Sequence, residues 1–324
     1  LAYSRQVEFS FSGNNRTVKA LLILYLPKTA KGKVPVFVSY NFAGNQAIHA
    51  DPEIRESFSA PLNIWGNDGM VRGSEKRRWP LEYIIGNGYG VATMCYNDIY
   101  PDRPDYVDKS ILPLFSDYTQ AAQKPESWQA IGAWAWGMSR ILDYLQTDKA
   151  IDPKQFIALG HSRLGKTALW AGAQDERFAI VISNNSGCGG AALFNRKFGE
   201  TAQAINHNFP HWFCRNFRQY NNREEAMPVD QHGLIALMAP RPVYIAGASE
   251  DLWADPKGEY LAGWEANPVY ALWGLKGIDK VDPLVPNTPI QDGHIGYHLR
   301  EGGHDILQYD WEQYIRFANR YFQR

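Results

Sequence analysis

A strand signal, a glycine, a serine and a helix signal follow one another directly at residues 156–166. The segment reads Phe-Ile-Ala-Leu-Gly-His-Ser-Arg-Leu-Gly-Lys, with Gly160 two residues before Ser162. A glycine at that position removes the Cβ that would clash across so sharp a strand-to-helix turn. The order is typical of a nucleophile elbow, the turn that lifts a serine hydroxyl above a sheet. The consensus glycine two residues after the serine is absent, because Leu164 stands there and Gly165 follows it.

Strand and helix signals alternate on both sides of this turn. Period-2 or short apolar runs predict strands at 6–12, 18–26, 36–40, 90–96, 156–159, 178–183, 243–246 and 295–299. Amphipathic or helix-forming stretches predict helices at 127–145, 164–173, 230–238, 256–273 and 309–322. The first two strands are expected to pair antiparallel, and the later strands, separated by helices, predict a mostly parallel sheet covered on both faces.

Three long irregular segments, 43–85, 97–125 and 184–229, are expected as inserted loops. No repeat, low-complexity tract or linker interrupts the chain, which predicts one domain over residues 1–324. The fold class predicted is therefore α/β, an α/β-hydrolase three-layer αβα sandwich. Its central sheet is mostly parallel, with antiparallel strands at the N-terminus.

Composition narrows the classes of partner. The 324 residues are 45% hydrophobic and 21% charged, with a net charge of −1 and no recurring basic patch, which disfavours nucleic acid and anionic membranes as partners. No apolar run approaches the roughly 18 residues of a spanning helix. The three cysteines have no metal-ligand spacing, and we expect no metal or cofactor. The chain opens at Leu1 without Met, and we expect a secreted or periplasmic protein whose signal peptide has been removed. We also expect a monomer.

A serine nucleophile needs a base, and the base needs a carboxylate that holds its tautomer. In this fold these groups follow the serine in the order acid, then histidine, each after a later strand. Glu250 and Asp251 follow the strand 243–246, and His304 follows the strand 295–299. The sequence therefore predicts the triad Ser162, Asp251 and His304.

Arg163, directly after the serine, is the second predicted catalytic group. Its backbone N–H is placed to meet the oxyanion that forms on attack, and its permanent guanidinium charge could stabilise the same oxygen. A structural ion pair is the alternative role. The side chain of His161, on the other side of the serine, is expected to point away from the nucleophile.

Three segments together resemble the bacterial glucuronoyl esterases of carbohydrate esterase family 15. They are Gly-His-Ser-Arg-Leu-Gly-Lys at 160–166, Asn-Asn-Ser-Gly-Cys-Gly-Gly-Ala-Ala-Leu at 184–193 and Glu-Asp-Leu-Trp-Ala-Asp-Pro at 250–256. The resemblance implies cleavage of esters between (4-O-methyl-)glucuronic acid of xylan and alcohols of lignin, without a metal. It also implies that Lys166 and Glu200 bind sugar hydroxyls and that Trp253 lines the uronic acid pocket.

Two departures from that family pattern bear on the site. Fungal members carry the catalytic acid as a glutamate just before Ser-Gly-x-Gly-Gly, where this chain has Asn185. The acid is then the later Asp251, as in bacterial members. Fungal members also join the residue before the serine to the residue before the histidine by a disulfide, and these are His161 and Gly303 here.

The predicted function is a serine carboxylesterase that acts on glucuronate esters of glucuronoxylan through an acyl-enzyme. Eleven tryptophans, several in polar loops, fit a sugar-stacking cleft as well as ordinary loop packing. The alternatives are an acetyl or feruloyl xylan esterase and a non-catalytic glycan-binding protein on a hydrolase scaffold.

Overall fold

A computed structural model describes residues 1–59, 71–115 and 124–323 of the chain. These residues form two compact units, each with its own four strands. The first unit comprises residues 1–153 and 209–216, and the second comprises residues 154–208 and 217–324.

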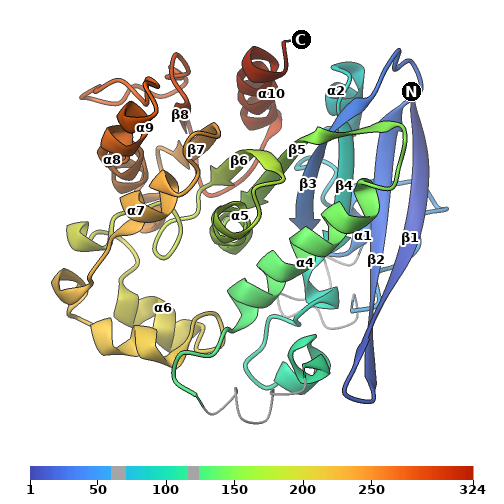
Figure 1. Cartoon of the computed structure of the whole chain (residues 1–324), viewed down its shortest axis with the longest axis horizontal. Helices are drawn as coiled ribbons and strands as arrows, with labels where there is room; N and C mark the ends of the chain where they lie inside the picture. The colour runs from blue at the N-terminus through green and yellow to red at the C-terminus, as the bar shows by residue number, and fades with distance from the viewer. Residues whose placement is uncertain (60–70, 116–123, 324) are drawn as a thin grey trace. The chain divides into compact units, whose positions relative to one another are not determined.

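The first unit is built on an antiparallel hairpin followed by a parallel pair. Its strands are β1 (Ala2–Gly13), β2 (Arg16–Pro27), β3 (Val34–Asn41) and β4 (Gly90–Cys95), in the spatial order β1-β2-β4-β3 (Figure 1). Asn14 and Asn15 connect β1 to β2 with φ of 49° and 58°, as a two-residue type I′ hairpin requires. β2 pairs antiparallel with both β1 and β4, whereas β3 and β4 are parallel. The predicted antiparallel N-terminal strands are confirmed.

The helices of the first unit are α1 (Asn45–Ile48), α2 (Leu81–Gly86) and α4 (Ala130–Leu145), with short 3-10 turns at Tyr96–Asp98, Val107–Lys109 and Leu112–Leu114. α4 packs against β3 through Gly137, because the Tyr40 hydroxyl lies where a Cβ would be and donates a hydrogen bond to the Trp134 carbonyl at 2.9 Å. Segments 43–85 and 97–115 hold only such short helices among their described residues. The remainder of the two predicted loops, 60–70 and 116–123, lies outside the described part of the chain.

The second unit contains four parallel strands in sequence order. They are β5 (Ile151–His161, most of it in this unit), β6 (Phe178–Asn184), β7 (Val243–Ala248) and β8 (Ile295–Arg300). Its helices are α5 (Arg163–Gln174), α6 (Ala202–Asn208), α7 (Gln231–Ala236), α8 (Pro256–Glu265), α9 (Asn267–Leu272) and α10 (Gln308–Phe322). Short 3-10 turns occur at Phe194–Arg196, Glu224–Ala226 and Leu252–Ala254, and Arg215–Tyr220 begins in the first unit.

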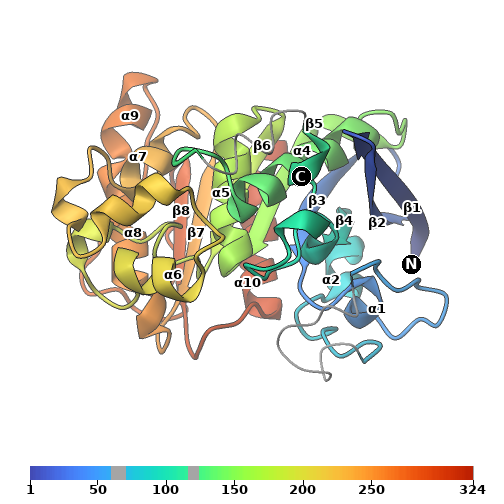
Figure 2. The same cartoon turned by 90° about the horizontal axis from the view of Figure 1, so that it is seen from below.

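Helices cover both faces of these strands. On β7, the Tyr244 ring packs against Phe317 of α10 with 4.9 Å between centroids, whereas the next residue, Ile245, contacts Gly263 of α8. Neighbouring residues on a strand point to opposite faces, so α10 and α8 lie on opposite sides. α5 lies on the same side as α8. Gly172 of α5 contacts Val181 of β6, which is in register with Val243 of β7, and Val243 points to the same face as Ile245. Figure 2 shows α5 beside β6 and α7 beside α8.

Two sequence expectations need correction in this unit. The single helix predicted at 256–273 is two helices, α8 and α9, which meet at Ala266. Pro268, at the second position of α9, cannot donate to the carbonyl of Trp264, and its ring clashes with that carbonyl in a continuous helix. The segment 184–229, predicted to be irregular, contains the seven-residue helix α6.

Candidate active site

Ser162 stands alone between a strand and a helix in a strained conformation. β5 ends at His161 and α5 begins at Arg163, and Ser162 takes φ 59° and ψ −129° between them. A non-glycine residue with such angles is held there by its surroundings, and such residues gather at active sites. Here the Ser162 N–H donates to the Asn184 carbonyl at 2.8 Å. This is the geometry of a nucleophile elbow.

The glycines around Ser162 explain the imperfect consensus. A Cβ on Gly160 would lie 1.8 Å from the Leu164 carbonyl oxygen, so this position accepts only glycine. Leu164, where the consensus has its second glycine, is instead buried in the core. Gly165 is the residue that packs closely, because a Cβ there would lie 2.9 Å from the Cβ of Ser186. The glycine one position later than in the consensus therefore allows α5 to lie close to the loop after β6.

Asp251 and His304 meet as the sequence predicts. Asp251 follows β7 and His304 follows β8, and the His304 Nδ1 lies 2.6 Å from the Asp251 Oδ2. The side chain of Asp251 is 6% exposed and that of His304 is 44% exposed. A buried carboxylate at Nδ1 fixes the tautomer in which Nε2 can accept a proton. The pair thus has the arrangement of a general base with its orienting acid.

Asn185 gives Asp251 a second partner that the sequence analysis did not assign. Its Nδ2 donates to the Asp251 Oδ2 at 2.8 Å. Burial opposes the charge on Asp251, but the hydrogen bonds from His304 and Asn185 outweigh it, and the pKa of Asp251 lies below its ordinary value. Asn185 therefore does not replace the glutamate of the fungal pattern as an acid. It helps to keep the later acid ionised.

Glu259 is a second buried carboxylate, and it contacts the loop that follows Asn185. This residue of α8 is 0% exposed, and its Oε1 accepts the N–H groups of Ser186 and Gly187 at 2.7 and 2.9 Å. Burial, and to a smaller degree the nearby charge of Asp251, raise the pKa of Glu259 to about 8. Glu259 thus fixes the turn that immediately follows Asn185. No motif in the sequence marks it, since the two contacting segments are far apart in the chain.

Lys166, Glu200 and Trp253 form the predicted sugar-binding group. The Lys166 Nζ lies 4.0 Å from the Glu200 Oε2, and their side chains are only 5% and 8% exposed. The Glu200 N–H donates to the Trp253 carbonyl at 2.9 Å, and the Trp253 indole hydrogen-bonds to the Glu200 carboxylate. The Trp253 ring remains exposed. One apolar ring and two hydrogen-bonding groups therefore stand together, as recognition of a sugar requires.

Burial moves both charged members of this group toward their neutral forms. It lowers the pKa of Lys166 and raises that of Glu200, while their mutual attraction opposes both changes. The charges of Arg163 and His304 also act on Glu200 and favour its ionised form. The predicted sugar-binding group and the predicted catalytic groups are therefore electrostatic neighbours.

The ring of His161 lies beside that of His304, the predicted base. Its ring centroid lies 4.6 Å from that of His304, and its Nδ1 lies 2.5 Å from the Asn184 Oδ1. Since His161 directly precedes Ser162, this contact brings the base beside the elbow. At the positions that fungal members join by a disulfide, the chain has His161 and Gly303, and all three cysteines are free.

Within residues 1–59, 71–115 and 124–323, no three His, Cys, Asp or Glu side chains are grouped so as to hold a metal ion. None of the helices described there combines the length and the apolar character needed to cross a bilayer.

Known proteins resemble this chain in both sequence and structure. A family model for glucuronyl esterases of fungi matches residues 118–274. The 4-O-methyl-glucuronoyl methylesterase 1 of Wolfiporia cocos (strain MD-104) is 33% identical over 68% of this chain and 55% of its own length.

Two solved structures match almost all of the chain. A promiscuous esterase of carbohydrate esterase family 15, from a marine bacterial metagenome, is 47% identical over 98% of this chain and 81% of its own, with a TM-score of 0.87. A glucuronoyl esterase from Solibacter usitatus is 39% identical over 98% of this chain and 86% of its own, with a TM-score of 0.85. The predicted α/β-hydrolase fold is confirmed by these matches.

Proposed function

The chain belongs to the glucuronoyl esterases of carbohydrate esterase family 15, and from this membership we propose a mechanism in which Ser162, His304 and Asp251 hydrolyse esters of glucuronic acid. The family resemblance drawn from the sequence is thereby confirmed, and the chain is a carboxylic ester hydrolase. The hydrogen bond of 2.6 Å between Asp251 and His304 supports the assignment of the residues most strongly.

The reaction runs in two halves. His304 takes the proton of the Ser162 hydroxyl through Nε2 while the serine oxygen attacks the C6 carbonyl carbon of the uronate ester. The backbone N–H and the guanidinium of Arg163 stabilise the oxyanion. His304 returns the proton to the departing alcohol and leaves an acyl-enzyme on Ser162. Water, deprotonated by His304, then attacks that ester and releases glucuronate and the free serine.

Lys166, Glu200 and Trp253 hold the sugar for this attack. A glucuronate ester is neutral at C6 and offers hydroxyl groups and a flat apolar face. Lys166 can donate to those hydroxyls and Glu200 can accept from them, while the exposed Trp253 ring offers a stacking surface. The buried ion pair fixes the two polar groups before substrate arrives, which reduces the ordering cost of binding.

A substrate panel tests the proposal. Initial rates are compared for benzyl glucuronate, methyl 4-O-methyl-glucuronate, acetylated xylan and feruloyl arabinoxylan at equal ester concentration. The proposal expects the two uronates to have the highest kcat/KM. Because the marine relative is described as promiscuous, weaker cleavage of other esters is compatible with the proposal. Faster cleavage of acetyl or feruloyl groups would favour the alternative xylan esterase.

A second assay tests whether the chain is a non-catalytic glycan-binding protein. A fluorophosphonate probe forms a covalent bond only with an activated serine. Labelling of the chain at Ser162, shown by peptide mass spectrometry, would exclude the binding-protein alternative. Intact protein without any label would support that alternative.

We propose that the two units form one catalytic domain over residues 1–324, that the enzyme is a monomer, and that it acts outside the cytoplasm on glucuronoxylan. A single cooperative transition in calorimetry would support one domain, whereas two separated transitions would contradict it. Light scattering gives the molar mass, for which 36.7 kDa is expected.

A further inference from the structure

The loop that carries His304 is held by a buried arginine at its own start. Arg300 is the last residue of β8 and is 4% exposed. Its Nη1 donates to the carbonyl of Glu301 at 2.8 Å, and its Nη2 donates to the carbonyls of Gly303 and Asp305 at 2.7 and 3.2 Å. Gly303 and Asp305 are the two chain neighbours of His304. The guanidinium therefore fixes the backbone on both sides of the proposed base.

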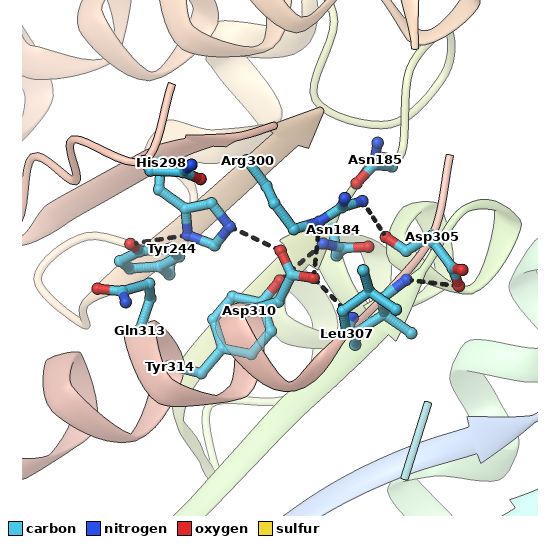
Figure 3. A network of polar contacts seen from close by, with 12 residues as sticks. Asn184, Asn185, Tyr244, His298, Arg300, Asp305, Leu307, Asp310, Gln313 and Tyr314 are labelled. Atoms are coloured by element: carbon cyan, nitrogen blue, oxygen red, sulfur yellow. Dashed lines mark hydrogen bonds and ion pairs between the residues drawn. The ribbon is translucent and has the colours of Figure 1, made fainter. Parts of the chain in front are cut away.

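Asp310 fixes the guanidinium in turn, as Figure 3 shows. Its carboxylate is fully buried and accepts from the Arg300 Nε at 3.1 Å and from the backbone N–H of Leu307 at 2.7 Å. The other carboxylate oxygen lies 2.8 Å from the Nε2 of His298, a buried residue of β8. Asp310 thus joins the end of β8 to the first turn of α10, which is the next element after the His304 loop.

The loop's own sequence, with two successive glycines, does little to keep it in one conformation. Gly302 takes a φ of +105°, a value that side chains rarely adopt, and a Cβ on Gly303 would meet no atom within 4 Å. Two successive glycines make a backbone segment flexible unless other groups restrain it. Besides Arg300, the loop is restrained by the N–H of Gly302 on the Ser249 hydroxyl, by the N–H of Glu250 on the Gly302 carbonyl and by the N–H of Glu301 on the Asn287 Oδ1. The first two contacts tie it to the loop of the acid, Asp251.

The same face of α10 is also connected to the elbow, through Asn184. Tyr314, one turn after Asp310, accepts a hydrogen bond from the Asn184 Nδ2 at 2.8 Å, and the Asn184 Oδ1 contacts the His161 ring. The backbone carbonyl of Asn184 also accepts a hydrogen bond from the backbone N–H of Ser162. One helix therefore supports the base through Asp310 and the elbow through Tyr314 (Figure 3).

We propose that Arg300, oriented by Asp310, is a positioning residue for the general base His304, an inference that rests on the proposed function. Only a guanidinium offers several donors in a fixed plane, so it can bind three carbonyls of one loop at once. A lysine at this position keeps the charge and the ion pair with Asp310 but cannot make all three bonds. A base that is displaced by about 1 Å loses a large part of the rate, on the order of a hundredfold.

The test compares Arg300→Lys with Arg241→Lys as a matched control. Arg241 also binds backbone carbonyls through its guanidinium, those of Gly172, Asp175, Phe178 and Leu237, but it touches neither the His304 loop nor the loop of the acid. We expect Arg300→Lys to lower kcat for benzyl glucuronate by about ten- to a hundredfold with KM within about twofold. Arg241→Lys should lower the thermal midpoint while kcat stays within twofold of the wild type.

A second variant separates positioning from general loss of structure. Arg300→Ala leaves space for a small guanidinium, and we expect methylguanidinium at millimolar, non-denaturing concentration to restore part of kcat, whereas equal NaCl does not. Absence of any rescue in a folded Arg300→Ala protein, together with a kcat of Arg300→Lys within twofold of the wild type, would overturn the inference. Equal losses of kcat in Arg300→Lys and Arg241→Lys would also overturn it.

The labelling rate with a fluorophosphonate distinguishes this inference from the function beneath it. The probe needs an activated serine but no sugar. A wild type that is not labelled contradicts the proposed function. A labelled wild type, with Arg300→Lys labelled equally fast, contradicts only the role of Arg300. The inference expects labelling of Arg300→Lys to slow by the same factor as kcat.

Discussion

Replacing Glu259 by Gln should change how the stability of the protein depends on pH. Glu259 is fully buried, and its pKa is raised to about 8 from an ordinary value of 4.5. Gln keeps the shape of the side chain and an oxygen that can accept from Ser186 and Gly187. It removes the group that titrates. The pH-dependent difference between the two proteins therefore reports the buried carboxyl.

Proton linkage determines whether the free energy of unfolding rises or falls with pH. Below about pH 4.5 the carboxyl is protonated in both the folded and the unfolded chain and contributes no difference. Between pH 4.5 and 8 the unfolded chain gives up the proton and the folded chain keeps it, so stability falls as pH rises. One pKa unit corresponds to about 1.4 kcal/mol. The wild type should lose about 3 to 4 kcal/mol between pH 5 and pH 8 that Glu259→Gln does not lose.

Urea unfolding at pH 5, 6, 7 and 8 measures this difference. The free energy of unfolding of Glu259→Gln minus that of the wild type should increase steadily over the series. A constant packing cost of the substitution shifts all four values equally and leaves the trend intact. Glu265→Gln, at an exposed position of the same helix, controls for the loss of one negative charge. A difference that stays constant from pH 5 to pH 8 would refute the assignment of a neutral buried Glu259.

Three further substitutions test the site. Asp251→Asn should lower kcat by about 10³- to 10⁴-fold because the amide stabilises the wrong His304 tautomer, and an active variant would transfer the role of acid to Glu250 or Asp305. Asn185→Leu removes one hydrogen bond to the Asp251 carboxylate, and steady-state kinetics should show kcat lower by about tenfold; an unchanged kcat would mean that Asn185 contributes only to packing. Glu200→Gln should raise KM for methyl glucuronate by about tenfold with kcat within twofold, and the reverse pattern would argue against a sugar-binding role.

The sequence predicted residues of the site in three ways: from a local signature, from the order of elements in the fold and from the family resemblance. The glycine at 160, the strand before it and the helix after it identify the elbow, because the steric demand of the turn falls on neighbouring residues. Asp251 and His304 could be assigned because the fold fixes the order in which acid and base follow their strands. Lys166 and Glu200 depended on the family resemblance, since nothing around either residue distinguishes it from a surface charge.

The parts that the sequence did not predict depend on contacts between distant segments. Glu259 bonds to Ser186 across 73 positions, and Asn185 bonds to Asp251 across 66. Neither pair has a spacing that a motif could record, because the sheet determines which loops meet. The break between α8 and α9 was different. Pro268 is visible in the sequence, and its missing N–H and its ring are a local reason for helix 256–273 to break.

We propose that Ser162 is the nucleophile of the ester cleavage, and the roles of His304 and Arg163 depend on this assignment. The most direct measurement is the hydrolysis of benzyl glucuronate by Ser162→Ala, with circular dichroism to show that the variant is folded. We expect a rate below one hundredth of the wild-type rate, because the alanine offers no oxygen to form the acyl-enzyme. A folded Ser162→Ala protein that retains more than a hundredth of the activity would contradict this assignment.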